Sequence, residues 1–264
     1  MHDFNYQKAG SVADAVSALK AAEDGKVMAG GMTLLPTMKQ RLAAPSDVID
    51  LGGISGIDGI DGSGGVTIGA MATHASVAGS AAVKGAIGAL ADLAEGIGDP
   101  QVRNRGTIGG SIANNDPAAD YPAACLALGA TIKTDRREIS ADDFFKGLFE
   151  TALEEDEIIT SVSFPQPEKA AYVKFPNPAS RYALVGVFVA KTAGGVRVAI
   201  TGAGDDGVFR ATALEQALSG NFSASALDGV SVSDDGLMSD IHASAEYRAH
   251  LITVMAKRAV AAAG

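Results

Sequence analysis

The hydrophobic pattern of the first 55 residues predicts two helices and two strands. Ser11 precedes apolar residues at helical spacing, which predicts a capped amphipathic helix that ends near Gly25. The short apolar run at residues 26–29 predicts a strand that leads into two glycines. Residues 34–42 return to helical spacing, and residues 48–51 predict a buried strand.

Glycine interrupts the pattern in the next part of the chain. Residues 52–65 carry seven glycines and predict turns between short strands. Residues 76–97 are rich in alanine and leucine and predict a mostly helical segment, broken at Gly79 or Gly85. Residues 106–111 predict a second glycine-rich loop.

The pattern then returns to regular elements. Residues 117–128 predict a helix capped by Asp116, and residues 131–134 predict a strand. The acidic run at residues 154–157 predicts a solvated turn. Residues 157–164 predict a further strand, which Pro165 ends.

The last third of the chain has a different composition. Four prolines fall between residues 165 and 178, and we place a domain boundary near residue 170. Beyond it, residues 184–192 and 196–201 predict two strands joined as a hairpin by Gly194-Gly195. Helices are predicted at residues 212–218 and from Ser239 to the end.

Composition and charge limit the classes of partner that this chain is expected to bind. The 264 residues are 47% hydrophobic and 20% charged, which is typical of a folded globular protein. The formal net charge of −10 argues against nucleic acid or an anionic membrane as the main partner. An anionic cofactor therefore needs local neutralisation by backbone N–H groups and a few cations.

Cys125 is the only cysteine, which excludes an intrachain disulfide and a thiolate cluster. Any iron–sulfur centre that works with this chain must therefore lie on another chain. We expect Cys125 itself to be a buried core thiol. The N-terminal residues lack the pattern of a signal peptide, and no apolar run is long enough for a membrane span, so the expected location is the cytoplasm.

The strongest candidate for ligand binding is the segment at residues 29–36, between a predicted strand and a predicted helix. Gly30 and Gly31 permit a tight turn that directs successive N–H groups at one point, where a diphosphate can bind. Thr33 adds a hydroxyl. A plain strand-to-helix turn explains the same residues, and the Rossmann fingerprint is absent.

A second candidate segment has similar chemistry. Residues 107–111 combine small residues and free N–H groups with a hydroxyl at each end, and Asn114, Asp116 and Asp120 follow. Their oxygens are suitable acceptors for ribose hydroxyls or an adenine amino group. Helix capping is the structural explanation for Asp116, whereas it does not account for Asp120.

Together these segments resemble a known family, the FAD-binding medium subunit of molybdenum hydroxylases of the xanthine dehydrogenase and carbon monoxide dehydrogenase type. The resemblance runs in order over nearly the whole chain, at residues 29–36, 71–74, 105–112, 114–120 and 239–248. It implies an α+β fold, with a two-subdomain FAD-binding domain of the vanillyl-alcohol-oxidase (PCMH) type. A smaller C-terminal α+β domain with an antiparallel sheet is implied after it.

The domains implied are residues 1–170, with subdomains of about 1–55 and 56–170, and residues 171–264. Carried over by motif position, the diphosphate site comprises residues 29–36 and 107–111, Asp120 binds the ribose or adenine end, and Lys174 lies near the isoalloxazine. The full set of cofactor-binding residues implied is Ala29, Gly30, Gly31, Met32, Thr33, Leu34, Leu35, Pro36, Ala72, Thr73, His74, Gly106, Thr107, Ile108, Gly109, Gly110, Ser111, Asn114, Asp116, Asp120, Ile159 and Lys174.

The chain departs from the family pattern in the first segment. Many members have histidine then serine where this chain has Met32 and Thr33, so the hydroxyl is kept and an imidazole is lost. We interpret His74 as a hydrogen-bonded structural histidine beside the site. His242, Glu246 and His250 fall on one face of the predicted last helix, but no other residue supports a metal site there.

The function implied is electron transfer. FAD on this chain would receive electrons from [2Fe–2S] clusters on a small subunit, while a large subunit with a molybdopterin cofactor oxidises the substrate. The resemblance implies a dimer of such heterotrimers and requires no nucleophile or general base here. The alternatives are a stand-alone flavin oxidoreductase of the same fold, and a non-catalytic nucleotide-binding or assembly subunit.

Overall fold

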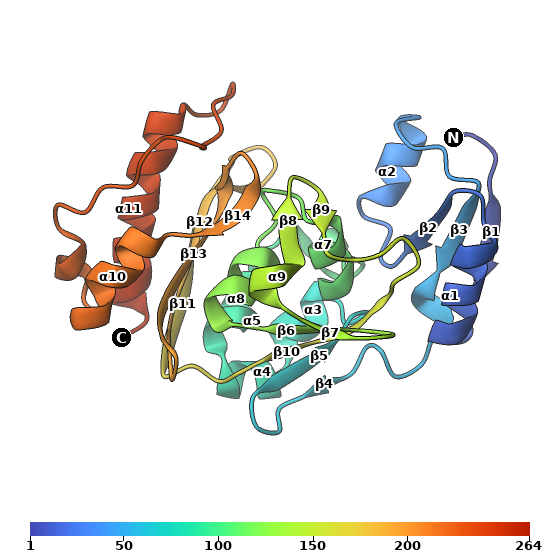
Figure 1. Ribbon diagram of the computed structural model, residues 1–264, viewed down its shortest axis with the longest axis horizontal. Helices are drawn as coiled ribbons and strands as arrows, with labels where there is room; N and C mark the ends of the chain where they lie inside the picture. The colour runs from blue at the N-terminus through green and yellow to red at the C-terminus, as the bar shows by residue number, and fades with distance from the viewer.

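The computed structural model describes residues 1–264 and begins with a small lobe of helices and strands. Its parallel sheet has the order β1-β3-β2, and the lobe forms one end of the molecule (Figure 1). Its elements are β1 (Asn5–Lys8), α1 (Val12–Ala21), β2 (Gly25–Met28), α2 (Leu34–Lys39), β3 (Asp47–Asp50) and the 3-10 turn η1 (Leu51–Gly53).

The two helices and two strands predicted for this lobe are confirmed with small shifts at the ends, whereas β1 was not predicted. The Ser11 side chain caps α1 by accepting a hydrogen bond from the N–H of Asp14 at 3.1 Å. Helix α2 stops at Lys39, short of the predicted end at residue 42, because Arg41 adopts the left-handed conformation with φ 60°.

The central part packs helices against a five-stranded antiparallel sheet. The strand order is β4-β5-β10-β6-β7, so a strand from late in the chain lies at the centre. Its strands are β4 (Ile60–Asp61), β5 (Val66–Gly69), β10 (Ile159–Phe164), β6 (Thr131–Thr134) and β7 (Glu138–Ser140). The largest hydrophobic cluster of the molecule lies between this sheet and the central helices.

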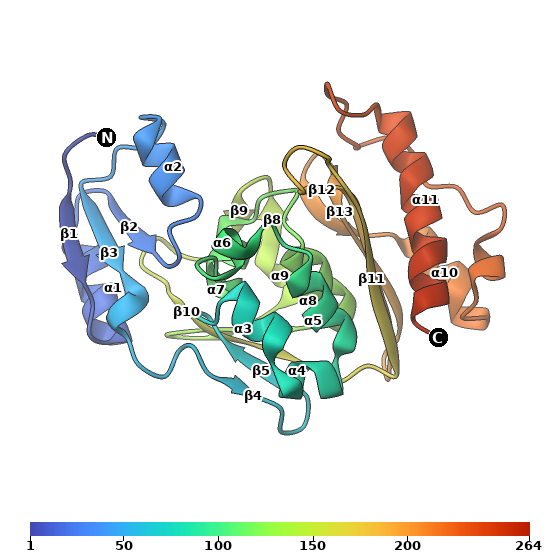
Figure 2. The ribbon, with the colours of Figure 1, turned by 180° about the vertical axis from the view of Figure 1, so that it is seen from behind.

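Seven helices and a small hairpin complete the central part (Figure 2). The predicted helical segment at residues 76–97 is confirmed as three short helices, with breaks at Ser80 and Ile87. The elements are α3 (His74–Gly79), α4 (Ala81–Ala86), α5 (Gly88–Glu95), α6 (Pro100–Arg103), α7 (Ile108–Asn114), α8 (Tyr121–Leu128), α9 (Ala141–Phe144), β8 (Phe145–Gly147) and β9 (Glu150–Thr151).

Two predictions for this part are wrong. The second glycine segment is not a loop, because α7 begins at Ile108 with Thr107 as its cap. Helix α8 begins at Tyr121 rather than residue 117, and Asp116 accepts from the N–H of Ala118 at 2.8 Å instead of capping it. The carbonyl of Pro117 accepts from the N–H of Gly202, so it is committed to the C-terminal sheet instead of a helix.

The C-terminal part is a four-stranded antiparallel sheet in the order β11-β12-β13-β14. One face contacts α5 and α8, and α10 and α11 pack on the other (Figure 1). The predicted hairpin is confirmed, but pairing of Thr192 with Gly195 makes Ala193 and Gly194 its two loop residues. The elements are β11 (Lys169–Pro176), β12 (Ala183–Thr192), β13 (Gly195–Gly204), β14 (Gly207–Arg210), α10 (Thr212–Gly220), the 3-10 turn η2 (Ala224–Leu227) and α11 (Ala245–Ala262).

The last helix starts later than predicted. Ser244 caps α11, so His242 lies before the helix and does not share a helical face with Glu246 and His250. No helix in the chain has the length and apolarity needed to cross a bilayer. The α+β class with an antiparallel C-terminal sheet is as predicted.

Candidate cofactor site

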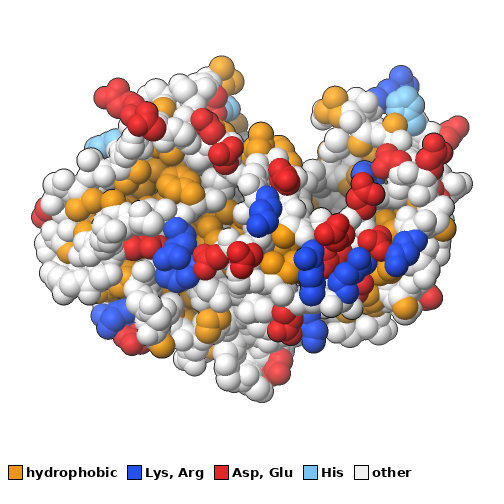
Figure 3. Space-filling view, viewed as in Figure 1, with side chains coloured by type: hydrophobic (Ala, Val, Ile, Leu, Met, Phe, Trp, Pro, Cys, Tyr) orange, Lys and Arg blue, Asp and Glu red, His pale blue; other side chains and the backbone are white.

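A cavity of about 790 Å³ lies between the N-terminal lobe and the central helices. Figure 3 shows the surface hollowed beside that lobe. The turn from β2 into α2 forms one wall and the start of α7 forms another, while the loop between β11 and β12 closes one end. Segments from all three parts of the fold therefore meet at one hollow, whose size suits a drug-sized or larger ligand.

The turn from β2 into α2 presents unpaired backbone donors. The N–H groups of Gly30, Gly31, Met32, Thr33 and Leu34 donate no hydrogen bond to any group of the chain. Gly31 has φ +74°, a conformation that glycine adopts without strain. A run of free N–H groups at a helix start favours an anion. The first segment therefore has the donors that the sequence predicted for a diphosphate.

Close packing against the second glycine segment requires glycine at position 30. A Cβ there would lie 2.0 Å from the carbonyl oxygen of Arg105 and 3.0 Å from the Cα of Gly106. The first glycine segment is thus pressed directly against the second, which brings two distant parts of the sequence to the same cavity.

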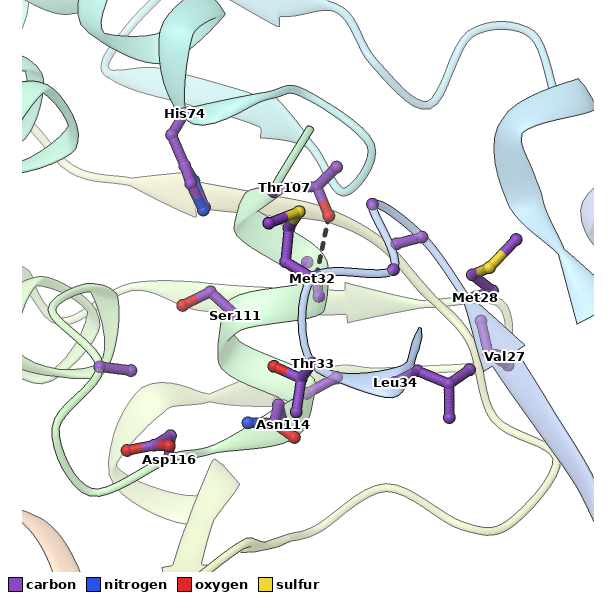
Figure 4. Close-up of a pocket in the computed structure, with 18 of the residues that line it drawn as sticks. Val27, Met28, Met32, Thr33, Leu34, His74, Thr107, Ser111, Asn114 and Asp116 are labelled. Carbon is purple, nitrogen blue, oxygen red and sulfur yellow. Dashed lines mark hydrogen bonds between the residues drawn. The ribbon is translucent and has the colours of Figure 1, made fainter. Parts of the chain in front are cut away.

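The second glycine segment uses its N–H groups within the protein. Ile108 donates to the carbonyl of Ala72 at 3.1 Å and Gly109 to that of Ala70 at 2.9 Å. Gly110 donates to Thr107 Oγ1 at 3.1 Å, as drawn in Figure 4. The expectation of free N–H groups along this segment is therefore wrong; what it adds to the cavity is the Ser111 hydroxyl, which has no partner in the protein.

Close packing explains the glycines of this second segment. A Cβ at Gly109 would lie 2.6 Å from the Cβ of Ala70, and one at Gly106 would lie 2.5 Å from His74 Nε2. Helix α7 can therefore approach β5 and α3 only because these two positions lack side chains.

His74 begins α3, behind a cap in which Thr73 Oγ1 accepts from the N–H of Ser76. Its side chain is buried and reaches into the cavity (Figure 4). Burial, with a smaller effect from the nearby positive charge of Arg103, lowers the His74 pKa to about 4. The ring is therefore neutral near pH 7. Nδ1 has no partner and the ring makes no hydrogen bond within the protein, unlike the structural histidine we expected.

Asp120 lies at the end of the cavity near the C-terminal sheet. Lys174 Nζ lies 3.1 Å from its Oδ1 and also donates to the carbonyl of Gly96 at 2.8 Å. The Tyr172 hydroxyl donates to the same carboxylate. Burial raises the Asp120 pKa, and the Lys174 charge and the two hydrogen bonds oppose this rise. Asp120 thus separates Lys174 from the cavity and joins two parts of the fold.

The opposite end of the cavity holds a second buried carboxylate. The Glu157 side chain is fully buried, and both its oxygens accept from Arg137, at 2.8 and 2.6 Å. Hydrogen bonding to Arg137 is the main cause that lowers the Glu157 pKa to about 2. The sequence predicted a solvated acidic turn here, and for Glu157 that prediction is wrong.

Most of the sequence-predicted residues meet in this cavity. Those that line it are Ala29, Gly30, Gly31, Met32, Thr33, Leu34, His74, Gly106, Thr107, Gly109, Gly110, Ser111, Asn114, Asp116, Asp120 and Ile159. Those that do not line it are Leu35, Pro36, Ala72, Thr73, Ile108 and Lys174. Ala72 and Ile108 lie in the hydrophobic core, and Lys174 lies behind Asp120.

Sequence reasoning missed the wall supplied by the C-terminal part. Arg181 and Tyr182 line the cavity from the loop between β11 and β12, and Arg181 donates to the carbonyl of Gly98 at 3.3 Å. Arg181 and Lys26 are the only Lys or Arg residues on the wall. No motif in the proline-rich segment marks these residues, so their position depends on how the chain folds back.

The cavity has the donors and the apolar wall that a dinucleotide with a diphosphate needs. The free N–H groups of residues 30–34 supply hydrogen-bond donors for an anion at one wall of the cavity. Apolar residues such as Met28, Leu51 and Ile159 line the cavity and offer a surface for a ring.

Comparison with known proteins agrees with this geometry. The family described as "FAD binding domain in molybdopterin dehydrogenase" matches residues 2–167, and "CO dehydrogenase flavoprotein C-terminal domain" matches residues 170–263. The nicotine 6-hydroxylase medium subunit of Paenarthrobacter nicotinovorans is 38% identical over 98% of this chain and 96% of its own length.

Carbon monoxide dehydrogenase is similar to this chain both in sequence and in structure. The medium chain from Hydrogenophaga pseudoflava is 34% identical, covering 98% of this chain and 96% of the relative. The structure of that enzyme lacking the Mo-pyranopterin moiety of the molybdenum cofactor matches with a TM-score of 0.89 at 35% identity, over 98% of this chain and 96% of the other. The chain therefore belongs to the family of FAD-binding medium subunits of molybdenum hydroxylases, which are flavoprotein subunits of oxidoreductases.

Proposed function

We propose that this chain holds FAD and passes electrons from the [2Fe–2S] clusters of a partner subunit to an external acceptor. The observation that carries the proposal is the run of five unpaired N–H groups at residues 30–34, which opens into a cavity of about 790 Å³. Because the chain is strongly acidic and few cations line the cavity, backbone donors are the available means of holding a diphosphate.

The residues of the first segment hold the diphosphate in this proposal. The N–H groups of residues 30–34 donate to its oxygens, and Thr33 and Ser111 add hydroxyl donors. Ala29 and the glycines of the second segment allow the cofactor to approach the backbone closely. Leu35, Pro36, Ala72, Thr73 and Ile108 support these groups from behind.

The polar residues beyond α7 orient the rest of the cofactor. Asn114, Asp116 and Asp120 present oxygens to ribose hydroxyls or an amino group, and Ile159 packs against a ring. Because Asp120 already accepts from Lys174 and Tyr172, its remaining lone pairs are held in a fixed direction. Lys174 offsets the negative charge of Asp120 at this end of the cavity.

Bound FAD supplies the redox chemistry, since it accepts and releases electrons one at a time. The chain binds it, fixes its orientation, excludes water from it and sets the charge around it. Cys125, the only cysteine, is buried in the central core, so the iron–sulfur clusters belong to another chain.

The assembly follows from the same proposal. We propose a small iron–sulfur subunit and a large subunit with the molybdopterin cofactor as partners, in a dimer of heterotrimers in the cytoplasm. Relatives named medium subunit or medium chain support a complex of several subunits. We retain the division into residues 1–170, with subdomains of about 1–55 and 56–170, and residues 171–264. The cavity then lies where the two subdomains and the C-terminal domain meet.

Two other functions remain as competing proposals. A stand-alone flavin oxidoreductase would need a substrate site of its own beside the cofactor. A nucleotide-binding or assembly subunit without redox activity would be consistent with Met32 at the position of the family histidine.

The test is a visible absorption spectrum of the purified native complex, with the released flavin identified and the subunits resolved by mass. We expect FAD on this chain, iron–sulfur absorbance and two companion subunits. A yellow chain that purifies alone and oxidises its own substrate would favour the stand-alone enzyme. A colourless chain that takes up no added FAD would contradict the proposal.

A further inference from the structure

Two polar atoms beside the cavity are buried without a partner. His74 Nδ1 and the Tyr121 hydroxyl make no hydrogen bond, and their side chains are 5% and 0% exposed. Their rings are neighbours, with centroids 5.4 Å apart and planes inclined by 41°. A buried polar atom without a partner costs about 1–3 kcal/mol, so two adjacent ones have a strong reason to be joined.

We propose that one internal water links the two groups, accepting from the Tyr121 hydroxyl and donating to His74 Nδ1, and so places the ring hydrogen on Nε2, from which it is donated to the bound dinucleotide. Tyr121 is thus a positioning residue that acts through His74. The ligand in this inference rests on the proposed function.

The direction of the hydrogen bonds follows from the chemistry of the two groups. A neutral imidazole carries one donor and one acceptor, whereas the phenol hydrogen of Tyr121 has no acceptor elsewhere in its surroundings. We therefore assign Nδ1 as the acceptor at the far end of this link, which leaves the ring hydrogen on Nε2. Burial and the positive charge of Arg103 disfavour the imidazolium, in agreement with the lowered His74 pKa.

The geometry directs that hydrogen to the cavity. His74 lines the cavity, and Figure 4 shows its ring reaching toward the side that holds Met32 and Ser111. Nε2 lies beside Gly106, where a Cβ would approach it to 2.5 Å. Only glycine at position 106 therefore allows the His74 ring to lie here, at the wall of the cavity.

The test is a nitrogen-15 NMR spectrum of the histidine rings of the whole chain, labelled at histidine and recorded at pH 7 without and with FAD. The chain has four histidines, and a His74→Gln variant assigns the signals. We expect an unprotonated Nδ1 and a protonated Nε2 in His74, with the Nε2–H signal shifted by FAD. The Tyr121→Phe variant should shift the Nδ1 signal and weaken FAD binding about three- to tenfold.

Tyr172→Phe is the matched control, because that hydroxyl donates to Asp120 and not to His74. It should leave the His74 signals in place. A protonated Nδ1, an imidazolium at pH 7, or His74 signals unchanged by Tyr121→Phe would overturn the inference. Failure of the proposed function is distinguishable, since a chain that binds no FAD still reports its His74 tautomer in the unliganded spectrum.

Discussion

The two glycine segments are nearly alike in sequence and opposite in use. The first, at residues 29–36, leaves five consecutive N–H groups unpaired at the cavity. The second, at residues 106–111, directs its N–H groups to the carbonyls of Ala70 and Ala72 and to its own cap, Thr107. Small residues allow a backbone to approach either a ligand or another part of the protein, and here each segment serves a different one.

The two uses lead to different expectations for mutation. A change in the second segment removes protein contacts and should reduce folding stability even without cofactor. A change in the first segment should mainly reduce FAD binding, because the chain itself makes no hydrogen bond to those N–H groups. The number of glycines in a segment does not indicate which of these two outcomes to expect.

The largest effect is expected from Gly109→Ala in the second segment. Its Cβ would meet the Cβ of Ala70 at 2.6 Å and the carbonyl oxygen of Ala70 at 2.7 Å, so α7 must move away from β5. Overpacking of this kind costs about 3 kcal/mol, to be measured as the free energy of unfolding in urea without FAD.

Gly85→Ala is the matched control, since Gly85 is also helical and has nothing within 4 Å of its Cβ position. It should leave stability unchanged or raise it by up to about 1 kcal/mol. Equal stability of the Gly109→Ala and Gly85→Ala proteins would show that the second segment is not held by close packing.

The next effect is a loss of stability at acid pH through His74, which packs against the second segment. Its pKa is lowered from 6.5 to about 4, so the folded protein favours the neutral ring. The resulting stability is fully present above pH 6.5 and is lost as pH falls toward 4, by up to about 3 kcal/mol.

Urea unfolding of His74→Gln across this range checks the prediction, because the variant should lose that slope. Asp156 and Glu157 have pKa values lowered to about 2. The stability that they contribute is present above about pH 4.5 and is lost only below it, so they do not affect the slope between pH 6.5 and 4.5. Asp120, whose pKa is raised, acts with the opposite sign, since its ionisation costs stability as pH rises. An unchanged slope between pH 6.5 and 4.5 would contradict the His74 assignment.

A smaller effect on folding, but a clear one on binding, is expected from Gly31→Ala. Its φ of +74° costs an alanine about 1 kcal/mol, and the contact of its Cβ is with the flexible end of Leu35. The altered turn redirects the free N–H groups, so FAD affinity should fall about tenfold or more.

Fluorescence titration of the unliganded protein with FAD gives the affinity, and unfolding gives the stability. Both losses are expressed as free energies. In Gly31→Ala we expect the loss of FAD-binding free energy to exceed the loss of unfolding free energy. In Gly109→Ala we expect the reverse. The opposite result in both variants would show that the second segment binds FAD and that the first segment stabilises the fold.

The smallest effect is expected from Ser111→Ala, which removes the hydroxyl that the second segment offers to the cavity. Because this hydroxyl has no partner in the protein, the stability of the unliganded chain should change by less than about 0.5 kcal/mol. FAD affinity should fall about threefold through the lost hydrogen bond, measured by the same titration. An unchanged affinity would exclude Ser111 from the binding site.

The sequence predicted much of the local structure and most of the cavity wall. The cap at Ser11, the mostly helical character of residues 76–97 and the hairpin between β12 and β13 were predicted from local patterns. The first glycine segment, Asp120 and His74 were also placed at the site, by resemblance to the family.

Tertiary contacts account for the predictions that were wrong. Residues 117–120 are not helical, because the Pro117 carbonyl accepts from Gly202 and Thr201 of β13. Glu157 is not solvated, because Arg137 folds over it. In each case the deciding partner lies far along the chain, where a local pattern contains no information about it.

The sequence by itself thus determined many of the helices and strands, that this chain has no thiolate cluster for iron–sulfur, and which short segments are small enough to approach a ligand. Only the tertiary structure decided which glycine segment keeps its N–H groups free, that Asp120 stands between Lys174 and the cavity, and that Arg181 and Tyr182 close one end. The physical reason is that a hydrogen-bond donor is available to a ligand only when no protein acceptor lies opposite it, and that acceptor is placed by folding.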